Sequence, residues 1–148
     1  MALKEQIQED VKTAMRAGDK PRVTTLRMLV AAVKQREVDE RIEADDALVL
    51  QVTEKLIKQR REAARQYAEA GRDELEAKEL AEADMLQVYL PEPLGADELA
   101  AMIDEVIDET GAASPRDMGK VMNALRERAQ GRADMSELSK LVKARLTA

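Results

Sequence analysis

YLPEPLG, residues 89–95, is the stretch that divides this sequence into two helical parts. Pro91 and Pro93 lack the backbone N–H that a helix needs, and each disfavours helical geometry in the residue before it. On both sides of this stretch the apolar residues recur at helical spacing, and no segment alternates in the manner of a β-strand. The sequence therefore predicts an all-α protein with a helical domain over residues 1–91 and a second over residues 95–148.

Four long helices are predicted before the two prolines. The first ends at Gly18, a residue suited to a helix C-terminus, and Asp19 is placed to cap the second. The second contains the run at 24–33, which is apolar around nearly its whole circumference and is expected to be covered on several sides. The fourth begins after Asp73 and is expected to be exposed along its middle. The third, over about residues 46–70, has a predicted apolar stripe of Val49, Val52, Leu56, Ala63 and Tyr67.

Three shorter helices are predicted after the prolines. The first ends at Gly111. The second opens at Ser114 to Asp117, which supply a cap residue, a proline at the first helical position and an acidic third position. It ends at Gly131, and Asp134 with Glu137 gives the pattern of a capping box for the last helix. The predicted core side of that last helix is Leu138, Leu141 and Val142.

The residue types that are absent exclude several kinds of chemistry. The chain has no His and no Cys, which excludes zinc fingers, thiol nucleophiles and Ser-His-Asp catalysis. It has no Phe or Trp and only two Tyr, so a binder of single strands that stacks bases on aromatic rings is disfavoured. We expect no catalytic residue set, no metal site and no cofactor.

Two further expectations concern location. No run approaches the 18 apolar residues that a membrane span needs, so we expect no membrane partner. MALKEQIQED, residues 1–10, lacks the apolar centre of a signal peptide, and from this we predict a cytoplasmic location.

Charge is distributed unevenly along the chain. Residues 1–111 hold 16 Lys+Arg against 26 Asp+Glu, whereas residues 112–148 hold 8 against 4, a net charge of +4. Thirteen carboxylates lie between Asp73 and Glu109. Asp104 and Asp108 share a helix face and could hold Mg²⁺, but a solvated acidic face is the better interpretation because nothing supplies the substrate phosphates that such sites usually add.

Two basic faces oppose this acidic background. Lys120, Arg132, Lys140 and Lys143 form the candidate site in the last two helices and the turn between them. A secondary basic face on the third helix consists of Lys58, Arg61 and Arg65, at spacings i, i+3 and i+7. Either face is also explained by solvation alone.

Two single residues stand out from their surroundings. Gly119 precedes Lys120, but a phosphate-binding loop would need a glycine at 114 and a hydroxyl at 121, where the chain has Ser114 and Val121. We therefore expect Gly119 to permit close packing of helices. Arg27 lies inside the apolar run at 24–33, so we expect a buried structural ion pair, with a ligand site as the alternative.

The assembled motifs resemble the GatB/YqeY family, specifically its stand-alone YqeY-like proteins. The residues that carry the resemblance are AGDKPRVTTLRML (17–29), IKQRREAARQYAEAGRDEL (57–75), YLPEPL (89–94), DMGKVMNALRERAQGRAD (117–134) and LVKARL (141–146). The C-terminal part is similar to the tail domain of the B subunit of the tRNA-dependent amidotransferase, which helps that enzyme hold tRNA. Met135 stands where the amidotransferase commonly has a proline.

The resemblance implies carbon–nitrogen ligase activity with glutamine as nitrogen donor only by association, because the amidotransferase performs that chemistry in a larger domain for which 148 residues of helix leave no room. Two hypotheses follow. One is a non-catalytic accessory that binds tRNA or another structured RNA. The other is a protein–protein adaptor whose acidic fourth helix meets a basic partner.

Overall fold

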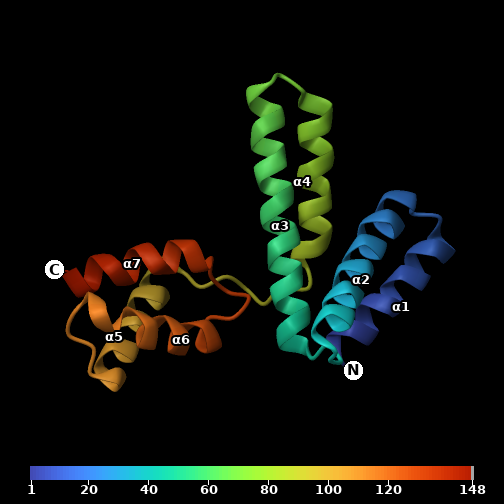
Figure 1. Cartoon of the computed structure of the whole chain (residues 1–148). Coiled ribbons are helices and arrows are strands. Elements are labelled where there is room, and N and C mark those ends of the chain that lie inside the picture. Colours follow the sequence, from blue (N-terminus) through green and yellow to red (C-terminus); the bar gives the residue numbers. More distant parts are fainter. Residues whose placement is uncertain (148) are drawn as a thin grey trace. The chain divides into compact units, whose positions relative to one another are not determined.

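The structure, a computed structural model, describes residues 1–147, and its regular elements in that range are all helices (Figure 1). In chain order they are α1 (Leu3–Ala17), α2 (Lys20–Glu40), α3 (Asp46–Glu69), α4 (Asp73–Gln87), α5 (Ala96–Thr110), the short 3₁₀ helix η1 (Pro115–Asp117), α6 (Met118–Arg128) and α7 (Met135–Thr147). The prediction of an all-α protein is confirmed. None of the helices within residues 1–147 is both long enough and apolar enough to cross a bilayer.

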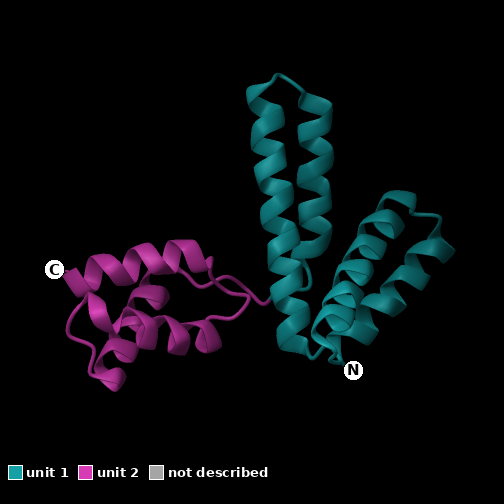
Figure 2. Ribbon diagram, in the orientation of Figure 1, with its two compact units in different colours: residues 1–90 teal, residues 91–148 magenta. Residues whose placement is uncertain are grey.

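The helices form two compact units (Figure 2). The first unit, Met1–Leu90, contains α1 to α4, and the second begins at Pro91 and contains α5, η1, α6 and α7. Pro91 and Pro93 lie in the non-helical stretch between α4 and α5, where a residue without an N–H breaks no helical hydrogen bond.

Two helix pairs make up the first unit: α1 packs along α2, and α3 packs along α4 (Figure 1). α2 also contacts α3 and α4, so it joins the two pairs. Its Leu26 and Leu29 have no exposed surface, and Val33 is almost fully buried. The run at 24–33 is nevertheless not covered all round, because Arg27 is exposed and Val30 is only partly buried.

The buried stripe of α3 differs from the predicted one in its second half. Val49 and Val52 are buried as expected, but further along Ile57 and Ala64 are buried while Leu56 and Ala63 are only partly so. Leu56 nevertheless packs against the core, because α3 contacts α2 as well as α4 and is covered over more than one stripe. The second half of the predicted stripe therefore consists of partly buried residues and misses Ile57 and Ala64, which are buried more deeply.

The second unit has its own core at the meeting of α5, α6 and α7. Its buried apolar residues are Leu99, Ile103 and Val106 from α5, Val121, Leu125 and Ala129 from α6 and its C-terminus, and Leu138, Val142 and Leu146 from α7. The prediction for α7 is wrong at Leu141, which is 42% exposed. Leu146 is buried with Leu138 and Val142 because these three positions recur every four residues and share one helix face.

Local hydrogen bonds start the helices where the sequence predicts. Asp19 Oδ1 accepts from the backbone N–H of Arg22 at 3.2 Å at the start of α2. Ser114 and Asp117 form a capping box at the start of η1, in which Asp117 Oδ2 accepts from the N–H of Ser114 at 3.3 Å and also from that of Ala113 at 2.9 Å. These backbone hydrogen bonds lower the pKa of the Asp117 carboxyl below its usual value.

Candidate nucleic-acid interface

The second unit contains an acidic helix, α5, in addition to its basic residues. α5 carries six carboxylates and no cation, and from Pro91 onward the chain holds 8 Lys+Arg against 11 Asp+Glu, a net charge of −3. The positive segment after residue 111 is therefore part of a unit that is acidic as a whole. Cations that are already paired with the carboxylates of α5 are less available to an anionic partner than cations that are not.

Two arginines of α6 and α7 pair with α5. Arg128, at the end of α6, lies with Nη2 2.6 Å from Glu105 Oε2 and with Nη1 3.8 Å from Glu109 Oε2. The hydrogen bond to Glu105 raises the pKa of Arg128 above its usual value. Arg145, near the end of α7, forms an ion pair with Asp104. These cations belong to the packing of the three helices, and Asp104 is held by an arginine.

Arg132 fastens the first residues of the second unit to the turn between α6 and α7. Its Nε donates a hydrogen bond to the backbone carbonyl of Glu92 at 2.8 Å, and its Nη2 lies 3.7 Å from Glu98 Oε2. Its backbone carbonyl accepts from the N–H of Leu94 at 2.8 Å. Arg132 therefore holds residues 92 and 94 beside the turn between α6 and α7, a role that the sequence did not indicate. Its contact with a phosphate stays a prediction.

The lysines of the candidate site differ from these arginines. Lys120, Lys140 and Lys143 are exposed, and none of them forms an ion pair within residues 1–147. Lys140 and Lys143 lie three residues apart on the face of α7 opposite its buried leucine and valine positions. Arg116, in η1, is likewise exposed and outside the ion pairs of the described chain. Arg128, Arg132 and Arg145 are thus paired within residues 1–147, whereas the three lysines and Arg116 are not.

The secondary basic face on α3 is exposed but largely paired. Arg65 donates to Glu69 at 2.7 Å and to Glu62 at 2.5 Å, and the hydrogen bond to Glu62 raises its pKa. Arg61 donates to Gln87 Oε1 on α4 at 3.0 Å, and Lys58 also has a partner. This face therefore offers a phosphate fewer open charges than its sequence spacing implied.

The buried guanidinium of the first unit is Arg60, which the sequence reasoning missed. Arg27, predicted to be buried, is exposed, with Nη2 3.5 Å from Met15 Sδ. The Arg60 side chain is 16% exposed, and its Nε lies 3.5 Å from Glu82 Oε2 on α4. Its Nη2 donates to Met28 Sδ at 3.2 Å. A signal was available, because Arg60 falls three residues after buried Ile57 and so lies on the ridge that packs against α4.

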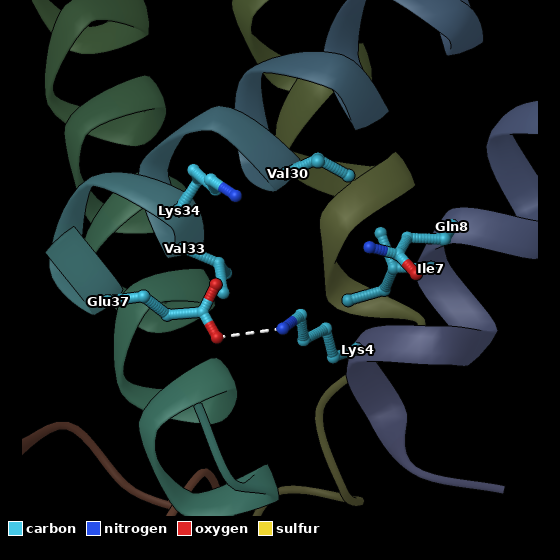
Figure 3. Close-up of a pocket in the computed structure, with 7 residues that line it drawn as sticks. All are labelled: Lys4, Ile7, Gln8, Val30, Val33, Lys34 and Glu37. Atoms are coloured by element: carbon cyan, nitrogen blue, oxygen red, sulfur yellow. Dashed lines mark hydrogen bonds and ion pairs between the residues drawn. The ribbon is translucent and has the colours of Figure 1, made fainter. Parts of the chain in front are cut away.

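A cavity of about 100 Å³ lies between α1 and α2 (Figure 3). Beside it Glu37 accepts hydrogen bonds from Lys4 Nζ at 2.7 Å and from the backbone N–H of Ala44 at 2.8 Å. The hydrogen bond with Lys4 lowers the pKa of Glu37, and it raises the pKa of Lys4. Sites for small molecules usually measure about 300–1,000 Å³, so these polar groups serve to hold α1 to the end of α2. The cavity is lined by Lys4, Ile7, Gln8, Val30, Val33, Lys34 and Glu37.

The acidic residues of the described chain do not gather into a metal site. Within residues 1–147 no group of three or more Asp or Glu side chains is placed to hold a metal ion. The first turn of α4 carries Asp73, Glu74 and Glu76, and carboxylates near a helix N-terminus are favoured by the helix dipole. Leu75 and Leu80 on the same helix are 36% and 44% exposed.

Comparison with known proteins gives the family. Residues 4–146 match the family described as Yqey-like protein. The chain belongs to the YqeY-like protein family.

Its curated relatives include fungal proteins named "Altered inheritance of mitochondria protein 41, mitochondrial". The chain is 38% identical to that of Eremothecium gossypii over 106 residues, which cover 70% of this chain and 58% of the relative. It is 32% identical to that of Vanderwaltozyma polyspora over 85 residues, 57% of this chain and 46% of the relative. It is 28% identical to the protein of Pyrenophora tritici-repentis over 128 residues, which cover 83% of this chain and 71% of the relative. The chain thus spans about half the length of the first two relatives.

These relatives correct one expectation. The absence of an apolar signal sequence led to the prediction of a cytoplasmic location, and that prediction is contradicted because the relatives are named as mitochondrial proteins. The physical reason is that the test applied to residues 1–10 detects only secretory signals, whereas mitochondrial targeting segments are amphipathic and lack the apolar centre.

Proposed function

We propose that this chain is a non-catalytic accessory protein that binds tRNA or another structured RNA through the lysines of α6 and α7. One observation carries the proposal. Lys120, Lys140 and Lys143 are exposed and outside the ion pairs of residues 1–147, whereas Arg128, Arg132 and Arg145 are paired with carboxylates of α5. Lysines left open beside an acidic helix are available to an anionic partner.

The kind of partner follows from the chemistry of the face. An exposed ammonium group meets a phosphate as a point charge, and such contacts supply affinity and orientation without reading bases. The chain has no Phe or Trp that would stack unpaired bases, so a folded RNA recognised by its backbone and shape is favoured over a single strand. The resemblance of the C-terminal part to a tRNA-holding tail domain supports the same class.

The carboxylates of α5 restrict the surface on which an RNA can bind. Glu98, Glu105 and Glu109 on α5 engage arginines within the unit, but Asp97 and Asp108 are outside the ion pairs of the described chain. Such carboxylates repel phosphates. An RNA is therefore expected to meet α6 and α7 and to stay away from the outer face of α5.

The test is the salt dependence of tRNA binding. Each neutralised phosphate contributes about −0.7 to −0.9 to the slope of log affinity against log salt, so three lysine contacts predict a slope between about −2 and −3. Changing Lys120, Lys140 and Lys143 together to Ala should make the slope less negative by about 2 to 3. Arg132 is kept in this variant because its removal would release residues 92 and 94.

A matched control has the same change of charge elsewhere. Lys20, Lys55 and Lys78 are exposed residues of the first unit that form no ion pair within residues 1–147, and their triple change to Ala should leave the slope as it is. Wild-type protein that fails to bind tRNA at low salt, or a candidate-site variant that keeps the full slope, contradicts the proposal.

No catalytic step is part of the proposal. The chain lacks His and Cys, and activation of a serine or threonine hydroxyl requires an adjacent base. We expect incubation with glutamine to release ammonia no faster than buffer alone. Release above that rate that disappears when one serine or one carboxylate is changed would show an activity that the proposal denies.

An adaptor that uses α4 is the second candidate. It is favoured by the exposed Leu75 and Leu80 among the carboxylates Asp73, Glu74 and Glu76, a combination that suits a basic partner with an apolar contact. Recovery of the protein from cells with its bound material, followed by nuclease treatment, separates the candidates. Nuclease releases material held by RNA, whereas a basic protein held by α4 stays bound and is lost when Glu74 and Glu76 are changed to Lys.

A further inference from the structure

Gly119 is the glycine whose place in the fold has no conformational explanation. The chain has six glycines. Gly18, Gly71, Gly111 and Gly131 have positive φ angles between 68° and 74°, which glycine adopts without steric cost. Gly95 precedes α5 as its N-cap, a position that favours glycine over most residues with a side chain. Gly119 alone lies inside a helix, as the second residue of α6.

Packing within the chain does not explain Gly119 either. A Cβ added at this position would meet nothing within 4 Å, and the residue is exposed. The expectation that Gly119 permits close packing of helices is therefore wrong, because no other helix approaches it. A glycine inside a helix destabilises it relative to alanine through the larger entropy of the unfolded chain. Here that cost is not offset by any contact that residues 1–147 make.

The residues around Gly119 indicate what an outside contact would be. Arg116 precedes it by three residues and Lys120 follows it directly, and both are exposed and form no ion pair within residues 1–147. Residues three and four apart are neighbours on a helix surface, which places Arg116 close to both Gly119 and Lys120. The bare main chain of Gly119 directly precedes that of Lys120. The carboxylate of Asp117 accepts hydrogen bonds from the backbone N–H groups of Ala113 and Ser114, and after these the charge of Lys120 also lowers its pKa, but the two side chains form no ion pair within residues 1–147.

We infer that Gly119 is a contact point for the sugar–phosphate backbone of the bound RNA, which passes over the uncovered main chain of α6 between Arg116 and Lys120. The inference rests on the proposed function. It goes beyond that function because it names one uncharged residue, Gly119, as the place where the RNA comes closest to the protein. A side chain at 119 holds the phosphates away from the helix surface, and Lys120 then loses its contact. The carboxylate of Glu127, two turns further along α6, limits the contact to the beginning of the helix.

The substitutions that test this inference separate binding from folding. Gly119→Ala adds one methyl group into open space and removes the entropic cost of glycine, so its thermal midpoint should rise. Its affinity for tRNA at low salt should nevertheless fall about threefold. Gly119→Leu should weaken binding by about tenfold and reduce the salt slope by about one, as expected when one lysine–phosphate contact is lost.

The control places the same bulk on the acidic helix. Ala101 is an exposed residue of α5, and Ala101→Leu should leave the tRNA affinity and the salt slope unchanged. The inference is overturned if both Gly119 variants bind tRNA as tightly as the wild type, while the proposed function then stands. If the wild-type protein does not bind tRNA, both the inference and the proposed function are contradicted. Weaker binding by a Gly119→Ala protein with a raised thermal midpoint supports the inference, because a folding defect cannot produce that combination.

Discussion

Replacing Tyr89 by Phe is expected to destabilise the first unit through a single lost hydrogen bond. The Tyr89 hydroxyl donates to Asp10 Oδ2 at 2.6 Å, and the tyrosine is 8% exposed. That length is typical of an O–H donor on a carboxylate, and hydrogen bonds to charged groups contribute about 1.5–3 kcal/mol. Because Asp10 is only half-buried and can recover some hydration, we take the lower part of this range, about 2 kcal/mol. For a unit of 90 residues this lowers the thermal midpoint by about 10 °C.

A double-mutant cycle isolates the interaction. Unfolding of the wild type, Tyr89→Phe, Asp10→Asn and the double variant is followed by far-UV circular dichroism, and the coupling energy of the pair is obtained from the four values. A coupling below about 0.5 kcal/mol would refute the reasoning, since both side chains could then be changed independently.

The same pair predicts a dependence on alkaline pH. Burial, reinforced by the hydrogen bond to Asp10, raises the pKa of Tyr89 above its ordinary value of about 10. The folded protein therefore keeps the phenolic proton at a pH where the unfolded chain loses it. This contribution to stability is complete below pH 10 and declines as the pH rises above it. The wild type should lose stability above pH 10 more steeply than Tyr89→Phe, and equal slopes would contradict the assignment.

Three other outcomes are expected from substitutions in the two units. The hydrogen bonds from Lys4 and from a backbone amide lower the pKa of Glu37, so the stability that Glu37 contributes is present above about pH 4.5 and is lost as the pH falls below it. Glu37→Gln should remove that part of the loss of helical signal in acid. Leu125→Ala, at a fully buried position, should cost about 2–5 kcal/mol in chemical denaturation, whereas Leu141→Ala, at a position 42% exposed, should change stability by no more than about 0.5 kcal/mol. Gly119→Ala should raise the free energy of unfolding by about 0.5–1 kcal/mol, and a decrease would show that the space around Gly119 is not open.

Local sequence patterns were sufficient to predict where several of the helices begin and end. Gly18 and Gly111 end α1 and α5 in the left-handed conformation, and Asp19 and the Ser114–Asp117 box begin the helices that follow them. These features depend on residues within one turn of each other, so a local pattern contains the necessary information. The exposure of Lys120, Lys140 and Lys143 followed in the same way from helical spacing.

The covered side of each helix and the pairing of charges depend on contacts between segments that are distant in the sequence. α3 buries Ile57 more deeply than Leu56, because it packs against both α4 and α2 and its covered surface is wider than the single predicted stripe. The buried guanidinium is that of Arg60, whose carboxylate partner Glu82 comes from another helix. Arg132 resembles an open cation in the sequence, yet it holds the backbone of Glu92, 40 residues earlier in the chain. Each of these outcomes depends on a partner brought near by folding, and the spacing of residues along one helix contains no information about that partner.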